Sequence, residues 1–67
     1  MKYYSNENKF YSIEDDGTIK MLMDCVGNKE VWTTSGVYKT EQELKDAKFS
    51  EISYEKLKKD YTIWFSF

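Results

Sequence analysis

One cysteine and a run of carboxylates are the residues of this chain best suited to chemistry. Cys25 could act as a nucleophile, but the chain contains no histidine, the usual general base beside a catalytic serine or cysteine. Its neighbours are Asp24 and Val26, so no adjacent cation favours the reactive thiolate. We interpret Cys25 as a small buried apolar side chain and expect the protein not to be an enzyme.

Glu14, Asp15 and Asp16 are the second candidate site, because grouped carboxylates can bind Mg²⁺ or Ca²⁺. A calcium loop needs oxygen ligands at set spacings over about twelve residues, whereas Gly17 is soon followed by the apolar Ile19. An Asp-Gly hairpin turn of type I′ explains the same residues more simply. We therefore expect no metal site. The sequence also has no glycine-rich phosphate-binding motif, so we expect no cofactor.

Aromatic residues are the third candidate, with six Tyr, four Phe and two Trp in 67 residues. Tyr and Trp are frequent anchors of protein interfaces. Trp32 and Trp64 are the first candidates for contact with a partner protein, followed by Tyr3 and Tyr11. The alternative, which the sequence leaves open, is that these side chains form a second small core beneath the helices.

Exposed tyrosines beside lysine can also stack on single-stranded nucleic acid, and Tyr3, Tyr4, Tyr11 and Lys9 could form such a platform. The net charge of −2 and the absence of arginine disfavour nucleic acid as the partner. A non-catalytic protein-interaction module is therefore the main functional hypothesis. A small nucleic-acid-binding regulator is the alternative.

The length of 67 residues predicts a single domain over 1–67. A lone cysteine cannot form an internal disulfide, so packing must hold the fold unless the chain forms a homo-oligomer. The sequence has no apolar run long enough to cross a membrane and no signal peptide, and a free thiol suits a reducing compartment. We expect a cytoplasmic protein.

The N-terminal half has the alternating, β-favouring pattern of antiparallel strands separated by turns. Alternation places Ile19, Met21, Met23 and Cys25 on one face of the third strand, and only Leu22 interrupts the opposite polar face. The strands are predicted over residues 2–5, 9–14, 18–25 and 30–34, with turns at 6–8, 15–18 and 26–29.

The C-terminal half is predicted to contain two short helices and a last strand. Thr40 and Glu43 have the spacing of a capping box, which begins a helix over 41–48. Ser53 can cap a second helix to about residue 60. Residues 61–67 alternate and favour a final strand. The predicted fold is α+β: a small, mostly antiparallel sheet of four to five strands with two short helices near the C-terminal end.

The chain as a whole resembles the short open reading frames of phages and prophages of low-GC Gram-positive bacteria. The resemblance lies in the opening Lys2-Tyr3-Tyr4, the aromatic hairpin with Asp-Gly, and a late Thr-Glu-Gln-Glu-Leu segment. Such proteins commonly act as stoichiometric binders. The resemblance implies a phage-encoded inhibitor or modulator of a bacterial host or defence protein, acting in the host cytoplasm.

Overall fold

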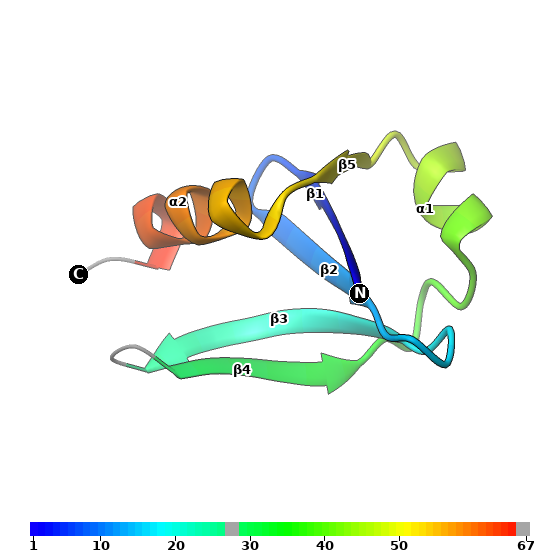
Figure 1. The fold of residues 1–67 in the computed structure, drawn as a ribbon, viewed down its shortest axis with the longest axis horizontal. Helices are drawn as coiled ribbons and strands as arrows, with labels where there is room; N and C mark the ends of the chain where they lie inside the picture. The colour runs from blue at the N-terminus through cyan, green and yellow to red at the C-terminus, as the bar shows by residue number, and fades with distance from the viewer. Residues whose placement is uncertain (27–28, 66–67) are drawn as a thin grey trace.

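The computed structural model describes residues 1–26 and 29–65, which form a five-stranded antiparallel sheet and two helices (Figure 1). In chain order the elements are β1 (Lys2–Asn6), β2 (Lys9–Ile13), β3 (Ile19–Val26), β4 (Lys29–Thr34), α1 (Glu41–Asp46), β5 (Ser50–Ile52) and α2 (Tyr54–Phe65). The strand order is β4-β3-β2-β1-β5. The predicted α+β class with an antiparallel sheet is confirmed. Only α2, with 12 residues, exceeds two turns, since α1 has six.

Local turn chemistry forms the first two hairpins. Glu7 adopts a φ of 55° between β1 and β2, and Gly17 adopts a φ of 90° between β2 and β3. The Gly17 N–H donates to the Glu14 carbonyl, so Asp15 and Asp16 are the central residues of a wider turn that Gly17 closes. The predicted type I′ turn is wrong, because Asp16 does not share the positive φ that this type requires. The centre of the predicted 26–29 turn, Gly27 and Asn28, lies outside the described residues.

The sheet is strongly curled, and Figure 1 shows the β3–β4 hairpin turned away from β1 and β2. Tyr3 on β1 and Trp32 on β4 have ring centroids 6.3 Å apart, although β2 and β3 lie between their strands. Three strand spacings in a flat sheet would separate these strands by about 14 Å. Curling therefore makes a concave face, which α2 covers, and an opposite face, which α1 covers.

The face under α1 carries the core cluster of Tyr4, Tyr11, Ile19, Leu44 and Phe49, which we call the α1 cluster. Thr40 caps α1 as predicted, since its Oγ1 accepts from the Glu43 N–H at 3.2 Å. The Glu43 carboxylate accepts from the Lys39 N–H, one residue earlier than a capping box expects. The cap positions Leu44, which is fully buried.

The helix α1 ends two residues before its predicted limit of residue 48. Lys48 adopts a φ of 70°, and its N–H donates to the Lys45 carbonyl. The Phe49 N–H then donates to the Leu44 carbonyl, and both side chains belong to the α1 cluster. This pair of hydrogen bonds and its apolar contact form a Schellman motif, which stops the helix and turns the chain into β5.

The concave face carries the core cluster of Phe10, Leu22, Leu57 and Tyr61, which we call the α2 cluster. Ser53 caps α2 as predicted, because its Oγ accepts from the Lys56 N–H at 3.2 Å. The last strand predicted over 61–67 is wrong for residues 61–65, which continue α2, while Ser66 and Phe67 lie outside the described residues. Leu57, Tyr61 and Phe65 recur every fourth residue on one helix face and all pack on the sheet.

The fifth strand lies instead at Ser50–Ile52, within a segment predicted to link the helices. It pairs antiparallel with β1, with Tyr3 opposite Ile52 and Ser5 opposite Ser50. The backbone of β1 is therefore paired on both sides, with β2 and with β5. Local sequence pattern could not predict the pairing with β5, because it joins residues far apart in the chain.

The face assignment predicted for the third strand is wrong beyond Met21. A register shift between Leu22 and Asp24 inserts one extra residue, so Leu22 and Cys25 both pack against the α2 cluster. Met23 is left exposed. A bulge of this kind reverses the alternation on which the prediction depended.

Candidate interaction surface

Glu30 on β4 is the centre of a polar cluster at the edge of the concave face. Its carboxylate accepts hydrogen bonds from the hydroxyls of Tyr54 at 2.7 Å and Tyr61 at 2.8 Å, both on α2. It also accepts from the indole N–H of Trp32 at 3.0 Å. Three neutral donors therefore converge on one half-buried carboxylate, and two of them tie α2 to β4.

The electrostatics of this cluster follow from burial and hydrogen bonding. Burial alone would raise the pKa of Glu30, but the hydrogen bonds from Tyr54, Tyr61 and Trp32 outweigh it and hold this pKa below its usual value. The hydrogen bond to Glu30, followed by burial, raises the pKa of Tyr54 to about 12. Burial, followed by the bond to Glu30, also raises the pKa of Tyr61. The carboxylate is thus ionised and both hydroxyls are protonated at neutral pH, which suits a structural fastening.

The structure places three of the four predicted contact residues in the protein interior or against it. Tyr11 is 3% exposed and stacks edge-on against Phe49 in the α1 cluster, so its ring offers nothing to a partner in this conformation. Trp32 and Tyr3 are half-buried and pack against the α2 cluster. These two residues therefore belong to a second core beneath α2, which is the alternative that the sequence left open.

Trp64 is the predicted contact residue that faces solvent, with 53% of its side chain exposed. Its neighbour Ile63 is 73% exposed. A helix turns 100° per residue, so Ile63 lies nearly opposite the buried Tyr61 and Phe65 positions. The two residues form an apolar patch on the outer side of the last turns of α2, at the opposite end of the molecule from α1 (Figure 1).

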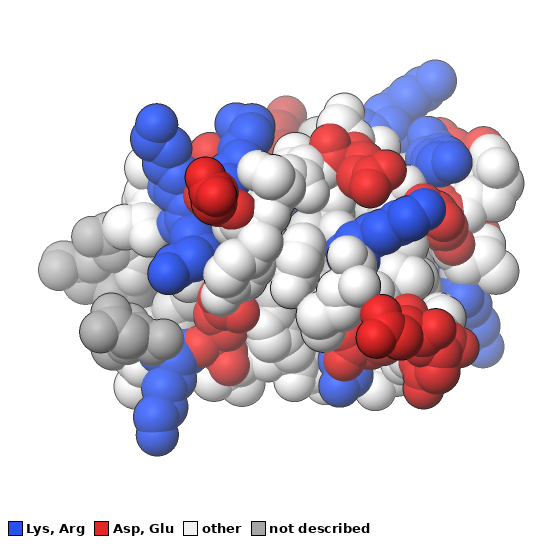
Figure 2. All heavy atoms as spheres, viewed as in Figure 1, with Lys and Arg blue, Asp and Glu red and all other residues white. Residues whose placement is uncertain are grey.

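Three lysines precede this patch on α2, and two of them contact other side chains of the helix. Lys56 pairs with Asp60 at 3.1 Å, and Lys58 lies 5.8 Å from the ring centre of Tyr54. Figure 2 shows basic and acidic side chains interspersed over the visible face of the molecule. The described residues of this face carry no continuous basic stripe of the kind that lines a nucleic-acid groove.

Cys25 packs beside Glu30 at the margin of the α2 cluster and is half-buried. Burial raises the pKa of its thiol, and the negative charges of Glu30 and Asp24 raise it further. A thiol held protonated in this way is a poor nucleophile at neutral pH.

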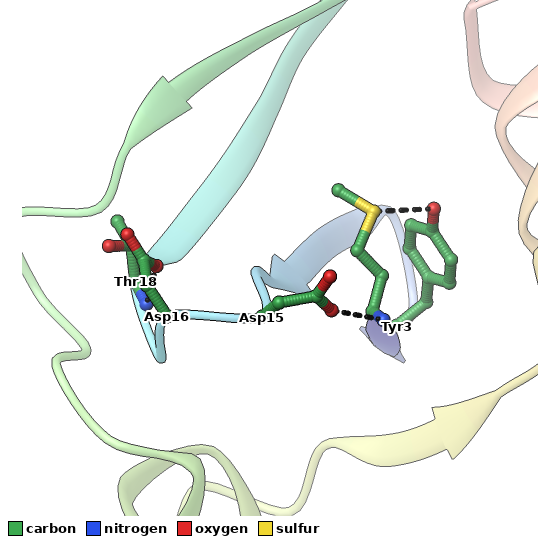
Figure 3. A network of polar contacts seen from close by, with 5 residues as sticks. Tyr3, Asp15, Asp16 and Thr18 are labelled. Atoms are coloured by element: carbon green, nitrogen blue, oxygen red, sulfur yellow. Dashed lines mark hydrogen bonds and ion pairs between the residues drawn. The ribbon is translucent and has the colours of Figure 1, made fainter.

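The predicted turn carboxylates lie beside an open hollow of about 290 Å³ near the N-terminus. Figure 3 shows their engagement: Asp15 pairs with the terminal ammonium of Met1 at 2.9 Å, and Asp16 lies beside Thr18. The Thr18 N–H donates to Asp16 at 2.9 Å, and this bond lowers the pKa of Asp16. No group of three metal-ligating side chains occurs within residues 1–26 and 29–65. Glu14 pairs with Lys20 at 3.1 Å through one oxygen, and its other oxygen is buried without a hydrogen-bond partner among the described residues. Turn formation and ion pairing engage Asp15 and Asp16.

Sequence reasoning missed both Glu30 and Ile63. Glu30 is only the first residue of the predicted strand 30–34, and Ile63 falls within the predicted strand 61–67, of which residues 61–65 are helical. The recurrence of apolar residues at Leu57, Tyr61 and Phe65 was the available signal for the helix, and it would have placed Ile63 outward.

Comparison with protein-family models, curated proteins and solved structures finds no match for this chain. Neither described helix has the length and apolar character needed to span a bilayer. The apolar patch of Ile63 and Trp64 therefore has to be interpreted from its own geometry.

Proposed function

We propose that this chain is a small non-catalytic module that binds a protein partner through the apolar patch of Ile63 and Trp64 on α2. The observation that carries the proposal is the exposure of two adjacent large apolar side chains on the solvent side of a helix, where polar residues are the rule. Burying a tryptophan removes about 150–250 Å² from water, and tryptophan is enriched among the residues that dominate binding energy.

The helix that carries the patch is well suited to rigid presentation. Tyr54 and Tyr61 fasten its first two turns to Glu30, and Leu57 is fully buried beneath it. A fixed helix loses little conformational entropy on binding, so more of the contact energy is available for affinity. The patch is then an anchor for a partner groove, flanked by the lysines of residues 56–59.

A bacterial host or defence protein is the proposed partner, and inhibition or modulation by a phage-encoded binder is the proposed role. The resemblance to short phage reading frames supports this choice. Shape and apolar contact are the proposed means of recognition, since the pKa of the cysteine is raised and Asp15 and Asp16 are engaged by local bonds.

The test begins with capture from lysate of a low-GC Gram-positive bacterium on immobilised protein, at low and at high salt. We expect a stoichiometric protein complex that persists in high salt, because apolar contacts are strengthened and not screened by salt. Retention of nucleic acid that is lost with added salt would favour the alternative function.

Variants of the purified pair then locate the surface. Trp64→Ala and Ile63→Ala are each expected to weaken binding about tenfold or more with an unchanged melting temperature. Val37→Ala is the matched control, because Val37 is 70% exposed in the segment before α1, far from the patch. Wild-type affinity in both α2 variants would refute this surface.

A further inference from the structure

The two edges of the sheet are protected to different degrees. The edge strand β5 has three residues, Ser50–Ile52, and one of them is the charged Glu51. Short length and charge are common means of preventing an edge from pairing with another strand. The other edge, β4, has six residues, and its last four, Val31–Thr34, carry no charge. Figure 1 shows β4 along the border of the molecule, where its side chains of Glu30 and Trp32 reach α2 and the α2 cluster but its outer edge carries no further strand of the described chain.

The register of β4 shows which of its backbone groups face outward. The Ser35 N–H donates to the Ile19 carbonyl, so Ser35 faces β3. Backbone groups of an antiparallel strand point to alternate sides, so Thr34 and Trp32 direct theirs away from β3. Glu30, two residues earlier on the regular strand, does the same. Within the described part of the chain, no backbone group bonds to these three from outside the sheet.

We propose that β4 pairs antiparallel with β4 of a second copy of this chain, about a two-fold axis at Trp32. In this register Trp32 lies opposite Trp32 of the partner subunit, and Glu30 lies opposite Thr34 of the partner subunit. Every outward N–H and C=O of the three residues then gains a partner, and the two sheets become one.

Charge and backbone pairing together select this register. Centring the pairing on Glu30 would set two carboxylates against each other, which opposes association. Centring it on Val31 or on Thr33 leaves one of the three outward-facing residues without a partner. The Trp32 register has neither fault, since Lys29 falls opposite Ser35 of the partner subunit. The strand is thus complementary to itself, as a two-fold interface requires.

Two substitutions at one exposed position test the register. Thr34→Lys sets a cation opposite Glu30 of the partner subunit, and Thr34→Glu sets a like charge there. We expect the dimer dissociation constant to fall about fivefold for Thr34→Lys and to rise about fivefold for Thr34→Glu, because each dimer contains two such pairs. Sedimentation equilibrium over a concentration series measures both constants.

The same variants carry an internal control, because Thr34 lies opposite Lys20 within its own sheet. Thr34→Glu therefore adds an attraction to Lys20 that stabilises the folded monomer, and a repulsion from Glu30 of the partner subunit that weakens the dimer. Thr34→Lys has the opposite effect on each. A general effect on folding would move monomer stability and dimer affinity in the same direction. Opposite changes support the proposed register.

A third variant, Thr34→Pro, removes an outward N–H that β3 does not use, and proline is tolerated at sheet edges. It is expected to give a monomer with native circular dichroism. A wild-type protein that stays monomeric to about 1 mM would overturn the proposal. So would a dimer that ignores all three Thr34 variants, or one that only Trp64→Ala disrupts. A monomer whose capture of another protein is lost in Thr34→Pro would assign the edge to that partner instead.

Discussion

On the concave face of the sheet, the carboxylate that meets the helix belongs to the sheet, whereas on the other face it belongs to the helix. Glu30 on β4 receives the hydroxyls of Tyr54 and Tyr61 from α2. Glu41, in the first turn of α1, receives the hydroxyl of Tyr4 from β1. On the concave face the tyrosines are on the helix and the carboxylate is on the sheet, and on the other face the tyrosine is on the sheet and the carboxylate is on the helix.

The two fastenings also differ in the charge of their partners. Glu30 has three neutral donors and is removed in part from water, whereas Glu41 pairs with the ammonium of Lys2 at 3.1 Å near the surface. Hydrogen bonds from Tyr4 and Lys2 lower the pKa of Glu41, and burial followed by the bond to Glu41 raises the pKa of Tyr4 to about 12. Glu30 thus acts mainly as a partly desolvated acceptor, whereas Glu41 combines a hydrogen bond from the buried Tyr4 with a screened ion pair to Lys2.

The largest expected effect comes from the leucine buried under each helix. Leu57→Ala under α2 and Leu44→Ala under α1 are each expected to cost about 2–5 kcal/mol of unfolding free energy, since both side chains are fully buried. Urea unfolding followed by circular dichroism measures the loss. Unfolding in two separate steps, or a loss below about 1 kcal/mol in one variant, would show that one face folds independently of its helix.

The second prediction separates the two carboxylates. Glu30→Gln keeps the size of the side chain but replaces one acceptor oxygen by an NH₂ group. That donor faces other donors, the tyrosine hydroxyls and the indole N–H, so at least one hydrogen bond is lost. We expect a loss of about 1–3 kcal/mol, measured by urea unfolding. Glu41→Gln is the matched control and should cost less, because its ion pair with Lys2 is well exposed and the remaining carbonyl oxygen can still accept from the Tyr4 hydroxyl. An equal or greater loss in Glu41→Gln would contradict the proposed difference.

The third prediction concerns acid. The folded-state pKa of Glu30 lies below its usual value, so its contribution is present above the unfolded pKa of about 4.3 and is lost as pH falls through the folded pKa. Stability of the native sequence should therefore decrease below about pH 4.3. Glu30→Gln should show a shallower decrease over the same range, measured as unfolding free energy against pH. Superimposable slopes would mean that Glu30 does not carry this dependence.

The smallest expected effect is that of salt. Raising ionic strength from about 0.1 M to about 1 M shortens the screening length from about 10 Å to about 3 Å. The stability gap between the native sequence and Glu41→Gln should narrow, because the Lys2–Glu41 pair is exposed to the ions. The gap for Glu30→Gln should persist, since its donors are neutral. Unfolding titrations in potassium chloride would show whether the two gaps respond alike.

The parts of the fold that sequence predicted are those held by neighbours in the chain. Thr40 and Ser53 begin α1 and α2 because each side chain reaches an N–H three residues later. The position of the turn between β2 and β3 was likewise predictable, although not its type, because Gly17 accepts the positive φ that closes it. Such interactions need no distant partner, so pattern and propensity suffice to locate them.

The candidate surface was only half predictable for the same reason. Trp64 was singled out because of its residue type, but Tyr61 and Phe65 fit a two-residue and a four-residue recurrence equally well. The helix is favoured because it places Tyr61 in the α2 cluster and packs Phe65 against the same cluster. That conformation turned Ile63 outward beside Trp64 and created the apolar patch.

Local sequence is enough to specify an α+β chain with an antiparallel sheet and helix starts at residues 41 and 54, because short-range hydrogen bonds and alternation encode these features. Three features depend on tertiary contacts: the helical conformation of residues 61–65, the pairing of β5 with β1, and the bulge that brings Leu22 and Cys25 to one face. The physical reason is burial: each of these choices is made by contacts between segments far apart in the chain, whose free energy exceeds the weak local preferences that a sequence pattern records.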